Sequence, residues 1–265
     1  MIGSQGFIGS RVAAHLARRG AAARCPDRGQ TLDGEPLGHV LYCAGLTADY
    51  ARRPFDTVEA HVASFAAIVR ACEYESIVYL SSTRLYDGGQ AGRESGGFLA
   101  DPENPRHLYD LSKGLGEWLC VHATGGRGRV ARLSSVYSAD LASDNFLHQL
   151  IEQALAGRCG AVETAPDASR DYVDVDDVCG LLVRLAVDGT RPIYNIASGE
   201  NVTNARIFDA LHEATGCRLT AANGPCHAVA PLIDIRAIVE DFGVRPRSVL
   251  DRIPEIVAAH SRQPR

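Results

Sequence analysis

The sequence predicts an α/β fold in which helices cover both faces of a largely parallel sheet. Short apolar runs of strand length alternate along the chain with longer segments whose apolar residues have helical spacing. The short runs are continuously apolar, which is typical of strands that are buried on both faces of a parallel sheet. The 265 residues are enough for one large domain, or for a domain with a modest appendage.

The first element is a glycine-rich turn that leads into a helix ending near Gly20. Glycine allows a tight turn and a close approach of the backbone to a pyrophosphate. The free N–H groups at the start of the following helix would point at the phosphates. We therefore assign the G-x-x-G-x-x-G turn to the binding of a dinucleotide cofactor, through Gly3, Gly6, Phe7, Ile8 and Gly9.

The remaining elements follow from apolar runs, helical spacing and stop signals. We expect buried strands at residues 40–44, 77–80, 129–133 and 193–197. We expect helices at residues 55–71, 109–121, 145–156, 171–185, 203–215 and 234–242, the last one stopped by Gly243. Residues 1–158 would form the cofactor-binding domain. Residues 159–265 would form mainly a small C-terminal part, interleaved with the sheet.

Composition and charge exclude several classes of partner. The net charge of −5 is well mixed and no basic run suggests nucleic acid. No apolar stretch could span a bilayer, and the N-terminus lacks the features of a signal peptide, so we expect a cytoplasmic protein without a membrane partner. The eight cysteines form no C-x-x-C pair, so we expect no metal site and no disulfide framework, only buried reduced thiols.

Tyr109 and Lys113 lie four residues apart, on one face of an expected helix. An unperturbed tyrosine, with a pKa of about 10, is a poor base, but a neighbouring cation lowers that pKa. Such a tyrosine can exchange a proton with a sugar or alcohol hydroxyl. The spacing alone also fits a surface lysine beside a half-buried tyrosine.

Asp27 lies 18 residues after Gly9, about where an acidic residue usually binds the adenosine ribose. A carboxylate would repel a 2′-phosphate and therefore favours NAD over NADP. NADP stays open because Arg24 and Arg28 flank Asp27 and an arginine could accept that phosphate. The alternative for Asp27 is a solvated turn residue after Pro26.

The glycine turn, Ser82 after the second strand, and the Tyr109–Lys113 pair occur in an order that resembles the extended short-chain dehydrogenase/reductase family. Within that family, the chain resembles in particular the NAD-dependent nucleotide-sugar epimerases and dehydratases. Five segments carry the resemblance, at residues 78–86, 109–117, 132–137, 170–177 and 194–199. The resemblance implies a Rossmann-type, doubly wound parallel sheet, NAD or NADP as cofactor, and a nucleotide-sugar substrate.

The resemblance also implies roles for single residues. Ser82 would hydrogen-bond the reacting hydroxyl or ketone, and Tyr109 would transfer the proton. Lys113 would hold the nicotinamide ribose and lower the pKa of Tyr109. Arg170 would meet the nucleotide diphosphate. Further cofactor contacts would come from Asp27, Arg28, Cys43, Ala44 and Gly45, and further substrate contacts from Thr83, Arg84 and Ser135. Ser82 could instead cap a strand end, and Arg170 could pair with Asp171 or Asp174.

Two departures from the family concern the fold. Met1 and Ile2 can supply only the last step of the family's first strand, so upstream residues, if they exist, are expected to raise the melting temperature. Only 11 residues separate Asp27 from His39, too few for the usual third strand. Because that strand would lie at the sheet edge, its loss is tolerable but should weaken cofactor binding.

Other departures concern the chemistry. Thr83 and Arg84 stand where the family's dehydratases carry an acidic pair, so elimination of water by that route is not expected. Ser135 replaces an asparagine that contacts substrate. His61 replaces another asparagine, and is either a polar residue that holds water or a half-buried helix histidine.

The sequence therefore favours an NAD(P)-dependent epimerase that acts on a nucleotide sugar, at C4, by transient oxidation. An NAD(P)H-dependent keto-sugar reductase is the first alternative. A non-catalytic dinucleotide-sensing or scaffold protein is the second. A homodimer is expected by analogy, through the helices that follow Phe55 and include Tyr109.

Overall fold

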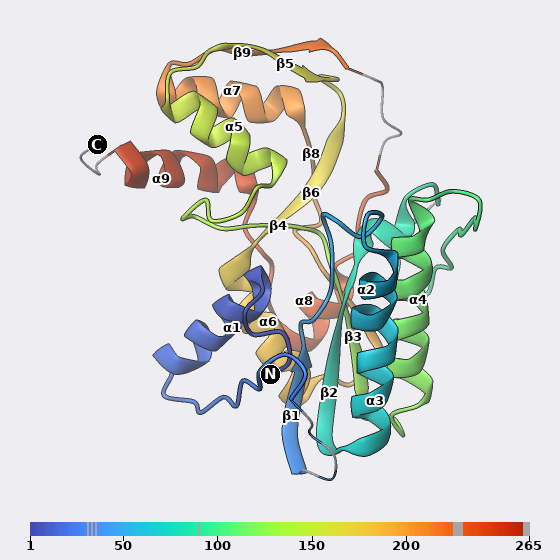
Figure 1. Ribbon diagram of the computed structural model, residues 1–265. Coiled ribbons are helices and arrows are strands. Elements are labelled where there is room, and N and C mark those ends of the chain that lie inside the picture. Colours follow the sequence, from blue (N-terminus) through green and yellow to red (C-terminus); the bar gives the residue numbers. More distant parts are fainter. Residues whose placement is uncertain (31, 33, 35, 90, 225–229, 262–265) are drawn as a thin grey trace.

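A parallel sheet with helices on both faces forms the lower lobe of the protein (Figure 1). The computed structural model describes residues 1–30, 32, 34, 36–89, 91–224 and 230–261. The sheet has the order β1-β2-β3-β7, and all its pairs are parallel. Its strands are β1 (Pro36–Tyr42), β2 (Glu73–Ser82), β3 (Gly128–Leu133) and β7 (Ile193–Ile196). The α/β fold predicted from the sequence is confirmed.

Two groups of helices cover the two faces of this sheet. One face carries α1 (Phe7–Arg18), α6 (Val175–Asp188) and α8 (Arg236–Phe242). The other carries α4 (His107–His122) and the segment from α2 to α3. Each side of the sheet has its own buried apolar core, centred on Val78 and Leu182 on the first side and on Phe65 and Tyr79 on the second. No helix in the described ranges is long and apolar enough to cross a membrane.

The helix expected at residues 55–71 contains a π-helical turn. It runs as α2 (Pro54–Val58), η1 (Glu59–Ala63) and α3 (Ser64–Ala71). Buried tyrosines satisfy carbonyl groups in the π turn: Tyr42 donates to Ala60 O at 2.6 Å and Tyr79 donates to His61 O at 3.0 Å. Single π turns often mark functional sites, and this one places His61 in the interior.

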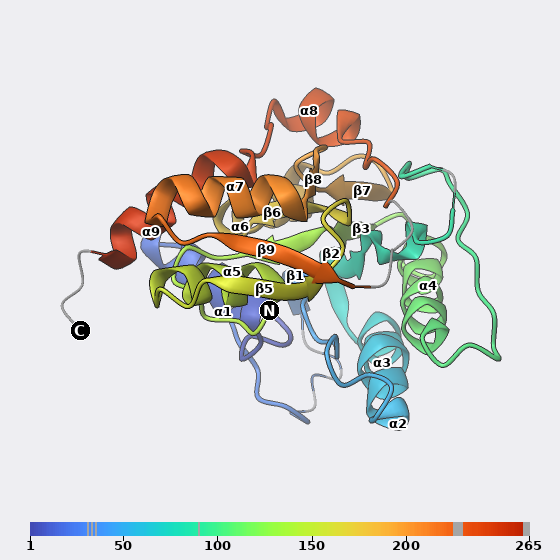
Figure 2. The same cartoon turned by 90° about the horizontal axis from the view of Figure 1, so that it is seen from above.

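A second lobe lies above the sheet and has a third apolar core (Figure 2). Its strands are β4 (Ser135–Tyr137), β6 (Ser169–Asp174) and β8 (Asn201–Thr203) in one sheet, and β5 (Gly160–Thr164) and β9 (Leu219–Asn223) in another. Its helices are α5 (Phe146–Leu155), α7 (Asn204–Thr215) and α9 (Val249–Ser261). The helix expected from residue 171 begins only at Val175, because residues 169–174 are strand β6. Asp174 caps it by accepting from Asp176 N at 2.9 Å.

The expectation that all cysteines are reduced thiols is wrong for Cys159 and Cys217. These two form a disulfide with a Cα–Cα distance of 5.3 Å. Cys159 immediately precedes β5 and Cys217 lies two residues before β9. The two cysteines are 58 residues apart in the chain, so their spacing did not indicate that they lie close together. Among the free thiols, Cys72, Cys120 and Cys179 are buried as expected, and Cys25 is exposed. Cys226 lies outside the described residues.

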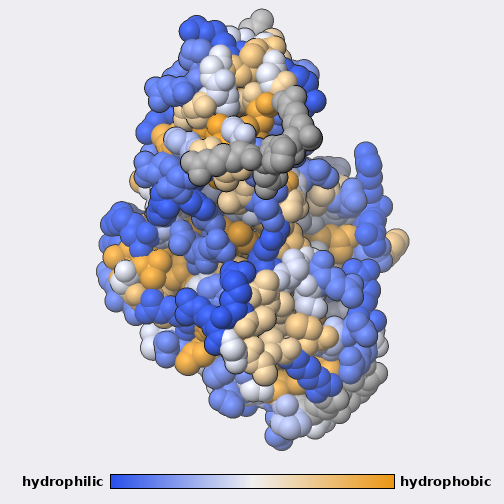
Figure 3. Space-filling view, turned by 90° about the vertical axis from the view of Figure 1, so that its left-hand side faces the viewer, coloured by the Kyte–Doolittle hydropathy of each residue, from blue (hydrophilic) through white to orange (hydrophobic). Residues whose placement is uncertain are grey.

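Ile2 pairs with the end of β1 on the side away from β2. Ile2 forms a single parallel bridge with Tyr42: Ile2 N donates to Leu41 O, and Cys43 N donates to Ile2 O, both at 2.9 Å. A groove of about 470 Å³ runs beside the rest of β1, between α1 and α6, and its walls include Leu16, Leu41 and Val183. Figure 3 shows this side of the molecule, with apolar side chains gathered on its lower part.

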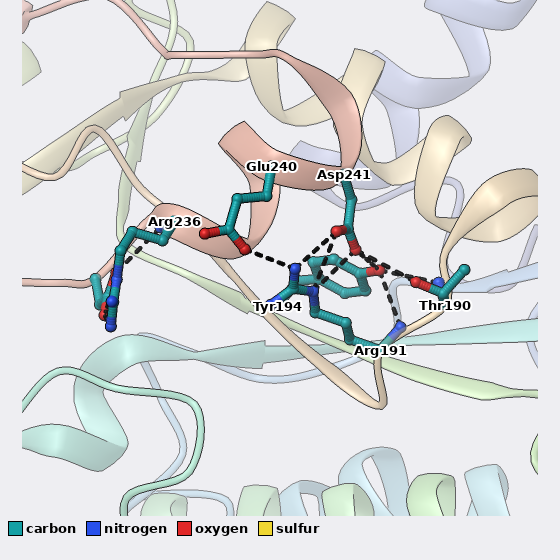
Figure 4. Close-up of polar contacts among 7 residues, drawn as sticks. Thr190, Arg191, Tyr194, Arg236, Glu240 and Asp241 are labelled. Carbon is teal, nitrogen blue, oxygen red and sulfur yellow. Dashed lines mark hydrogen bonds and ion pairs between the residues drawn. The ribbon is translucent and has the colours of Figure 1, made fainter.

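Polar contacts fasten α8 to the start of β7 (Figure 4). Tyr194 donates its hydroxyl proton to Asp241 at 2.7 Å. The guanidinium of Arg191 forms ion pairs with Asp241 and Glu240, both at 2.8 Å. Strand β7 and helix α8, which come late in the chain, therefore belong to the lower lobe.

Candidate active site

Strand β2 and helix α4 bring Ser82, Tyr109 and Lys113 together. Ser82 is the last residue of β2, and its side chain lies close enough to Tyr109 to oppose the rise of the Tyr109 pKa. Tyr109 itself lies buried in the first turn of α4. One turn later, the buried Lys113 Nζ donates to Leu80 O of β2 at 2.8 Å. The three side chains meet at the carboxyl end of β2, the edge where parallel sheets of this kind bind ligands.

Burial dominates the electrostatics of the pair. Burial raises the pKa of Tyr109 to about 12, and the largest opposing effects come from Ser82 and Arg84. Burial also lowers the pKa of Lys113 to about 7, against the effect of Glu117. The Lys113 ammonium is directed to a carbonyl of β2, and its lowering of the Tyr109 pKa stays a prediction.

Ser82 has two contacts, which correspond to the two roles considered for it. Its Oγ accepts from Arg84 N at 3.2 Å and so caps the short 3-10 helix η2 (Thr83–Tyr86), and its side chain also lies beside Tyr109. The cap fixes the serine hydroxyl where β2 ends. A capping role and a role at the reacting centre are compatible at this position.

Arg84 lies directly against Tyr109. Its guanidinium carbon is 4.7 Å from the centre of the Tyr109 ring and 4.9 Å from the centre of the Tyr50 ring. Arg84 Nη2 donates to the Tyr50 hydroxyl at 2.8 Å. Its Nε is buried and has no hydrogen-bond partner among the described residues. Arg84 is therefore part of the site and not a solvated surface residue.

The glycine turn packs closely against the end of β1. Gly3 has a φ of +78°, and a Cβ there would lie 2.6 Å from Ala44 N. A Cβ on Gly9 would lie 2.2 Å from Gly3 O, so a larger residue fits at neither position. Helix α1 begins at Phe7 with Gly6 as its N-cap, and no side chain caps its first N–H groups. The turn and these N–H groups fit the phosphates of a dinucleotide.

Gly45 and His61 lie beside Lys113. A Cβ on Gly45 would be 3.2 Å from both Lys113 Nζ and His61 Nε2. His61 Nε2 accepts from Leu46 N at 3.1 Å, and Nδ1 lies 2.8 Å from Ser112 Oγ, which itself donates to Tyr109 O. This network requires the Nδ1-protonated tautomer. Burial lowers the pKa of His61 to about 3, so the ring is neutral and holds the loop at Gly45 in place.

Several residues predicted for the site lie in other surroundings. Cys43 follows β1, and burial raises the pKa of its thiol to about 12. Asp27 and Arg28 are exposed, and Asp27 forms a turn in which Gln30 N donates to Asp27 O at 3.1 Å. This is the surrounding expected of a solvated turn residue. Ser135 is half-buried at the start of β4.

Arg170 is exposed on β6 and forms no ion pair with any described residue. The carboxylates considered as its partners are engaged elsewhere: Asp171 accepts from Ser198 N at 2.9 Å, and Asp174 pairs with Arg252 at 2.9 Å. The salt-bridge alternative for Arg170 is therefore wrong. Its guanidinium is available to a ligand.

Sequence reasoning missed a buried polar network behind the site. Arg132 binds Glu117 through two contacts, Nε–Oε1 at 2.9 Å and Nη2–Oε2 at 2.6 Å, and Arg132 Nη1 donates to the Tyr86 hydroxyl at 2.8 Å. Tyr86 in turn donates to Asn195 Oδ1 at 2.7 Å. The four residues belong to four of the resembling segments. The sequence did carry one indication of this network, because Arg132 is a charged residue inside the apolar run 129–133.

A sequence profile of the NAD dependent epimerase/dehydratase family matches residues 1–197. The chain belongs to this family. The predicted resemblance is thereby confirmed, and so is the prediction of an enzyme class that depends on a nicotinamide cofactor.

Two curated relatives are reductases. The chain is 25% identical over 254 residues to a GDP-6-deoxy-D-mannose reductase of Pseudomonas aeruginosa, covering 84% of this chain and 82% of the relative. It is 25% identical over 192 residues to a dTDP-4-dehydro-6-deoxyglucose reductase of Escherichia coli, covering 67% and 58%.

Solved structures show the same fold. The UDP-glucose 4-epimerase of Thermotoga maritima superposes with a TM-score of 0.79 at 18% identity, covering 98% of this chain and 97% of that one. MoeE5, solved with UDP-glucose and NAD, superposes with a TM-score of 0.78 at 21% identity over the same shares. The Rossmann-type fold is thereby confirmed.

Proposed function

We propose that this protein moves a hydride and a proton at a hydroxyl-bearing carbon of a nucleotide-activated sugar, and that its favoured reaction is the reduction of a keto-sugar. The observation that carries the proposal is the meeting of the Ser82 hydroxyl and the Tyr109 phenol at the carboxyl end of β2. A keto oxygen placed there would accept a hydrogen bond from Ser82 and a proton from Tyr109.

The described residues fit a dinucleotide. The turn from Gly3 to Gly9 and the first N–H groups of α1 would hold the pyrophosphate, and Ala44 and Gly45 would line the path towards Lys113. Lys113 would hold the nicotinamide ribose. The nicotinamide supplies the hydride chemistry when it is bound. The protein supplies position, the exclusion of water and the proton.

The names of the two curated relatives support the choice of substrate class and direction. Both are reductases of nucleotide-linked deoxysugars, and we extend that class to this chain. Arg170 would bind the diphosphate, where a planar fork of donors suits phosphate oxygens. Ser135 and Thr83 would lie beside the sugar, together with the buried Nε of Arg84. Because Thr83 and Arg84 carry no carboxylate, we propose no elimination of water.

A C4 epimerase is the second candidate. The family motifs favour it, and so do folds such as the Thermotoga epimerase. An epimerase must keep its cofactor through two half-reactions. In this chain the predicted ribose ligand, Asp27, lies in an exposed turn, and the described residues between α1 and β1 form no strand. A cofactor site that is open on the adenosine side is better suited to a cofactor that exchanges at every turnover.

The test is a reductase assay with purified protein, NADH or NADPH, and GDP- or dTDP-linked 4-keto-6-deoxysugars, followed by the absorbance of the reduced nicotinamide. We expect one molecule of reduced cofactor to be consumed for each keto-sugar reduced. The reaction should be faster with NADH than with NADPH if Asp27 contacts the ribose. Tyr109→Phe should lose roughly 10²–10⁴ in kcat with an unchanged melting temperature. Interconversion of two sugars without added cofactor would identify an epimerase. Binding of the cofactor without turnover, and full cellular function of Tyr109→Phe, would identify a sensor.

We also propose that two copies associate through the outer surface of α2 and α4. These helices lie next to each other and their exposed side chains include Phe55 and Val58 on α2 and Leu111, Leu115 and Trp118 on α4. An apolar surface of this kind on adjacent helices is typical of an interface between subunits.

A further inference from the structure

The burial of Tyr109 conflicts with its proposed role in proton transfer. Its phenol is buried and burial favours the neutral form, yet the proposed function requires it to exchange a proton. Ionisable or polar groups face it from every neighbouring element: Tyr79 and Ser82 of β2, Arg84 of η2, Tyr50 before α2, His61 of η1, and Asp110 and Lys113 of α4. Charge among these groups decides how easily the phenolate forms.

Lys113 directs its ammonium group to β2. Its Nζ donates to Leu80 O at 2.8 Å and lies 5.0 Å from the centre of the Tyr79 ring. Burial lowers its pKa to about 7, so that near neutral pH the side chain is charged in only about half of the molecules. His61 is neutral, and Asp110 is a buried acid whose charge opposes a phenolate.

Arg84 is well placed. A guanidinium stays charged at every pH at which proteins are folded. That of Arg84 lies against two rings, 4.7 Å from the centre of Tyr109 and 4.9 Å from that of Tyr50, and it donates to the Tyr50 hydroxyl at 2.8 Å. The ring centres are 5.4 Å apart, so the guanidinium contacts both rings at once and is held there by its hydrogen bond to Tyr50. A cation at this distance favours the ionised form of its neighbour.

We propose that Arg84 is a positioning residue for Tyr109, a second cation besides Lys113 that stabilises the Tyr109 phenolate, and that the Tyr50 hydroxyl keeps it there. This inference rests on the proposed function and concerns the same site. It assigns to Arg84, which stands where the related dehydratases carry an acidic residue, a role in proton transfer at Tyr109. It also explains how a buried Asp110 is tolerated one residue from Tyr109, since the same guanidinium faces both groups.

The test measures the ionisation of Tyr109 without substrate or cofactor. Tyr109 is replaced site-specifically by 3,5-difluorotyrosine, whose electron-withdrawing fluorine atoms lower the pKa of the phenol into an accessible pH range. The fluorine chemical shift then reports the ionisation of this one residue. In the Arg84→Met background we expect the titration midpoint to rise by about one pH unit, because an opposite charge nearby typically moves a pKa by about one to three. Tyr50→Phe, which keeps the ring but removes the hydrogen bond, should raise the midpoint by less.

Arg127→Met is the matched control. Arg127 stacks on Tyr74 with its guanidinium carbon 4.8 Å from the ring centre, so the variant removes a similar cation from a site away from Tyr109. It should leave the fluorine titration midpoint unchanged. An unchanged or lowered midpoint in Arg84→Met, with a melting temperature like that of the parent, would overturn the inference.

Activity provides the second measurement and separates this inference from the proposed function. If the protein is a reductase, the pH profile of kcat for Arg84→Met should move towards higher pH, in step with the fluorine titration midpoint. If no sugar is turned over, the proposed function fails while the fluorine titration still decides the role of Arg84. A loss of kcat with an unmoved pH profile would show that Arg84 acts only on the substrate or on folding and not on the ionisation of Tyr109, and would overturn the inference.

Discussion

Lys113 is a cation that the fold keeps away from water, and its burial has a cost that depends on pH. Its pKa falls from 10.5 to about 7 in the folded protein. Below pH 7 both the folded and the unfolded chain bind the proton. Between pH 7 and 10.5 only the unfolded chain keeps it, so the free energy of unfolding rises with pH over this window.

We predict that Lys113→Met removes this dependence. The parent protein should gain a few kcal/mol of stability between about pH 7 and pH 9.5 relative to the variant, since a tenfold change in a proton-binding constant corresponds to about 1.4 kcal/mol. Urea titrations of both proteins across this range would measure the difference. Parallel curves would contradict the depressed pKa.

The ion pair of Arg132 with Glu117 is the strongest buried charge contact in the described part of the chain, with both side chains at most 7% exposed. Removing one partner leaves the other charge buried and unpaired. We predict that Glu117→Gln costs about 3 kcal/mol, at the lower end of the usual range because the amide still fills the space. Urea denaturation would measure it. Glu255→Gln, which removes the charge of a half-exposed carboxylate paired with Arg247 and Arg252, is the control and should cost less than about 1 kcal/mol.

At the scale of single elements, local signals predicted the lower lobe well. Gly20 and Gly243 were expected to stop helices, and they have φ angles of +70° and +63° in the structure. Helix α9 was missed because Pro254 lies inside it and argues against a helix. The strands of the upper lobe were missed because segments of three to six residues carry too little periodicity.

The predicted site was correct in its placement of Tyr109 and Lys113 on one helical face, because that depends on local spacing alone. The direction of the Lys113 ammonium was not predictable, since its partner, Leu80 O, belongs to a strand 33 residues away in the chain. For the same reason the stacking of Arg84 on Tyr109 was invisible in the sequence. Contacts of this kind depend on how β2 and α4 pack.

The disulfide gives the upper lobe a cross-link between the starts of β5 and β9. Closing a loop of 58 residues removes entropy from the unfolded chain, worth about 4 kcal/mol by the loop-closure estimate. We predict that Cys159→Ser lowers the stability of the protein by up to that amount. Denaturation with and without reductant would show it, because reduction should affect the parent and leave the variant unchanged. Equal sensitivity of both proteins would contradict the pairing.

Among the described residues, only Ile2 pairs with strand β1 on the side away from β2, beside the groove that Leu16, Leu41 and Val183 help to line. A strand added there would pair with β1 in the parallel direction already set by Ile2 and Tyr42. We predict that four apolar, β-branched residues fused before Met1 raise the melting temperature by several degrees, through hydrogen bonds and apolar burial. An extension of four serines is the control. Equal melting temperatures for the two fusions would show that the groove does not accept a strand.

At the scale of the whole molecule, α4 connects the active site to the outer surface. Its inner face carries Tyr109 and Lys113, both buried, while its outer face exposes Leu111, Leu115 and Trp118. The outer three are spaced i, i+4 and i+7, so they form one stripe along α4, and α2 with its exposed Phe55 lies next to this helix (Figure 1). An interface on this stripe would therefore hold the helix that positions the proton-transfer residue.

We predict that Trp118→Glu converts a dimer into a monomer. Trp118 is 58% exposed, and a carboxylate at that position would be desolvated in an apolar interface without a partner. Light scattering coupled to size-exclusion chromatography at micromolar concentrations would show twice the chain mass for the parent and a single mass for the variant. Val187→Glu is the control and should remain dimeric. Val187 is an apolar residue of α6 that is as exposed as Trp118 but lies on the opposite side of the sheet. A monomeric parent would show that α2 and α4 serve another partner. A dimeric Trp118→Glu would place the interface elsewhere, and α4 would then owe its position to its packing on β2 and β3 alone.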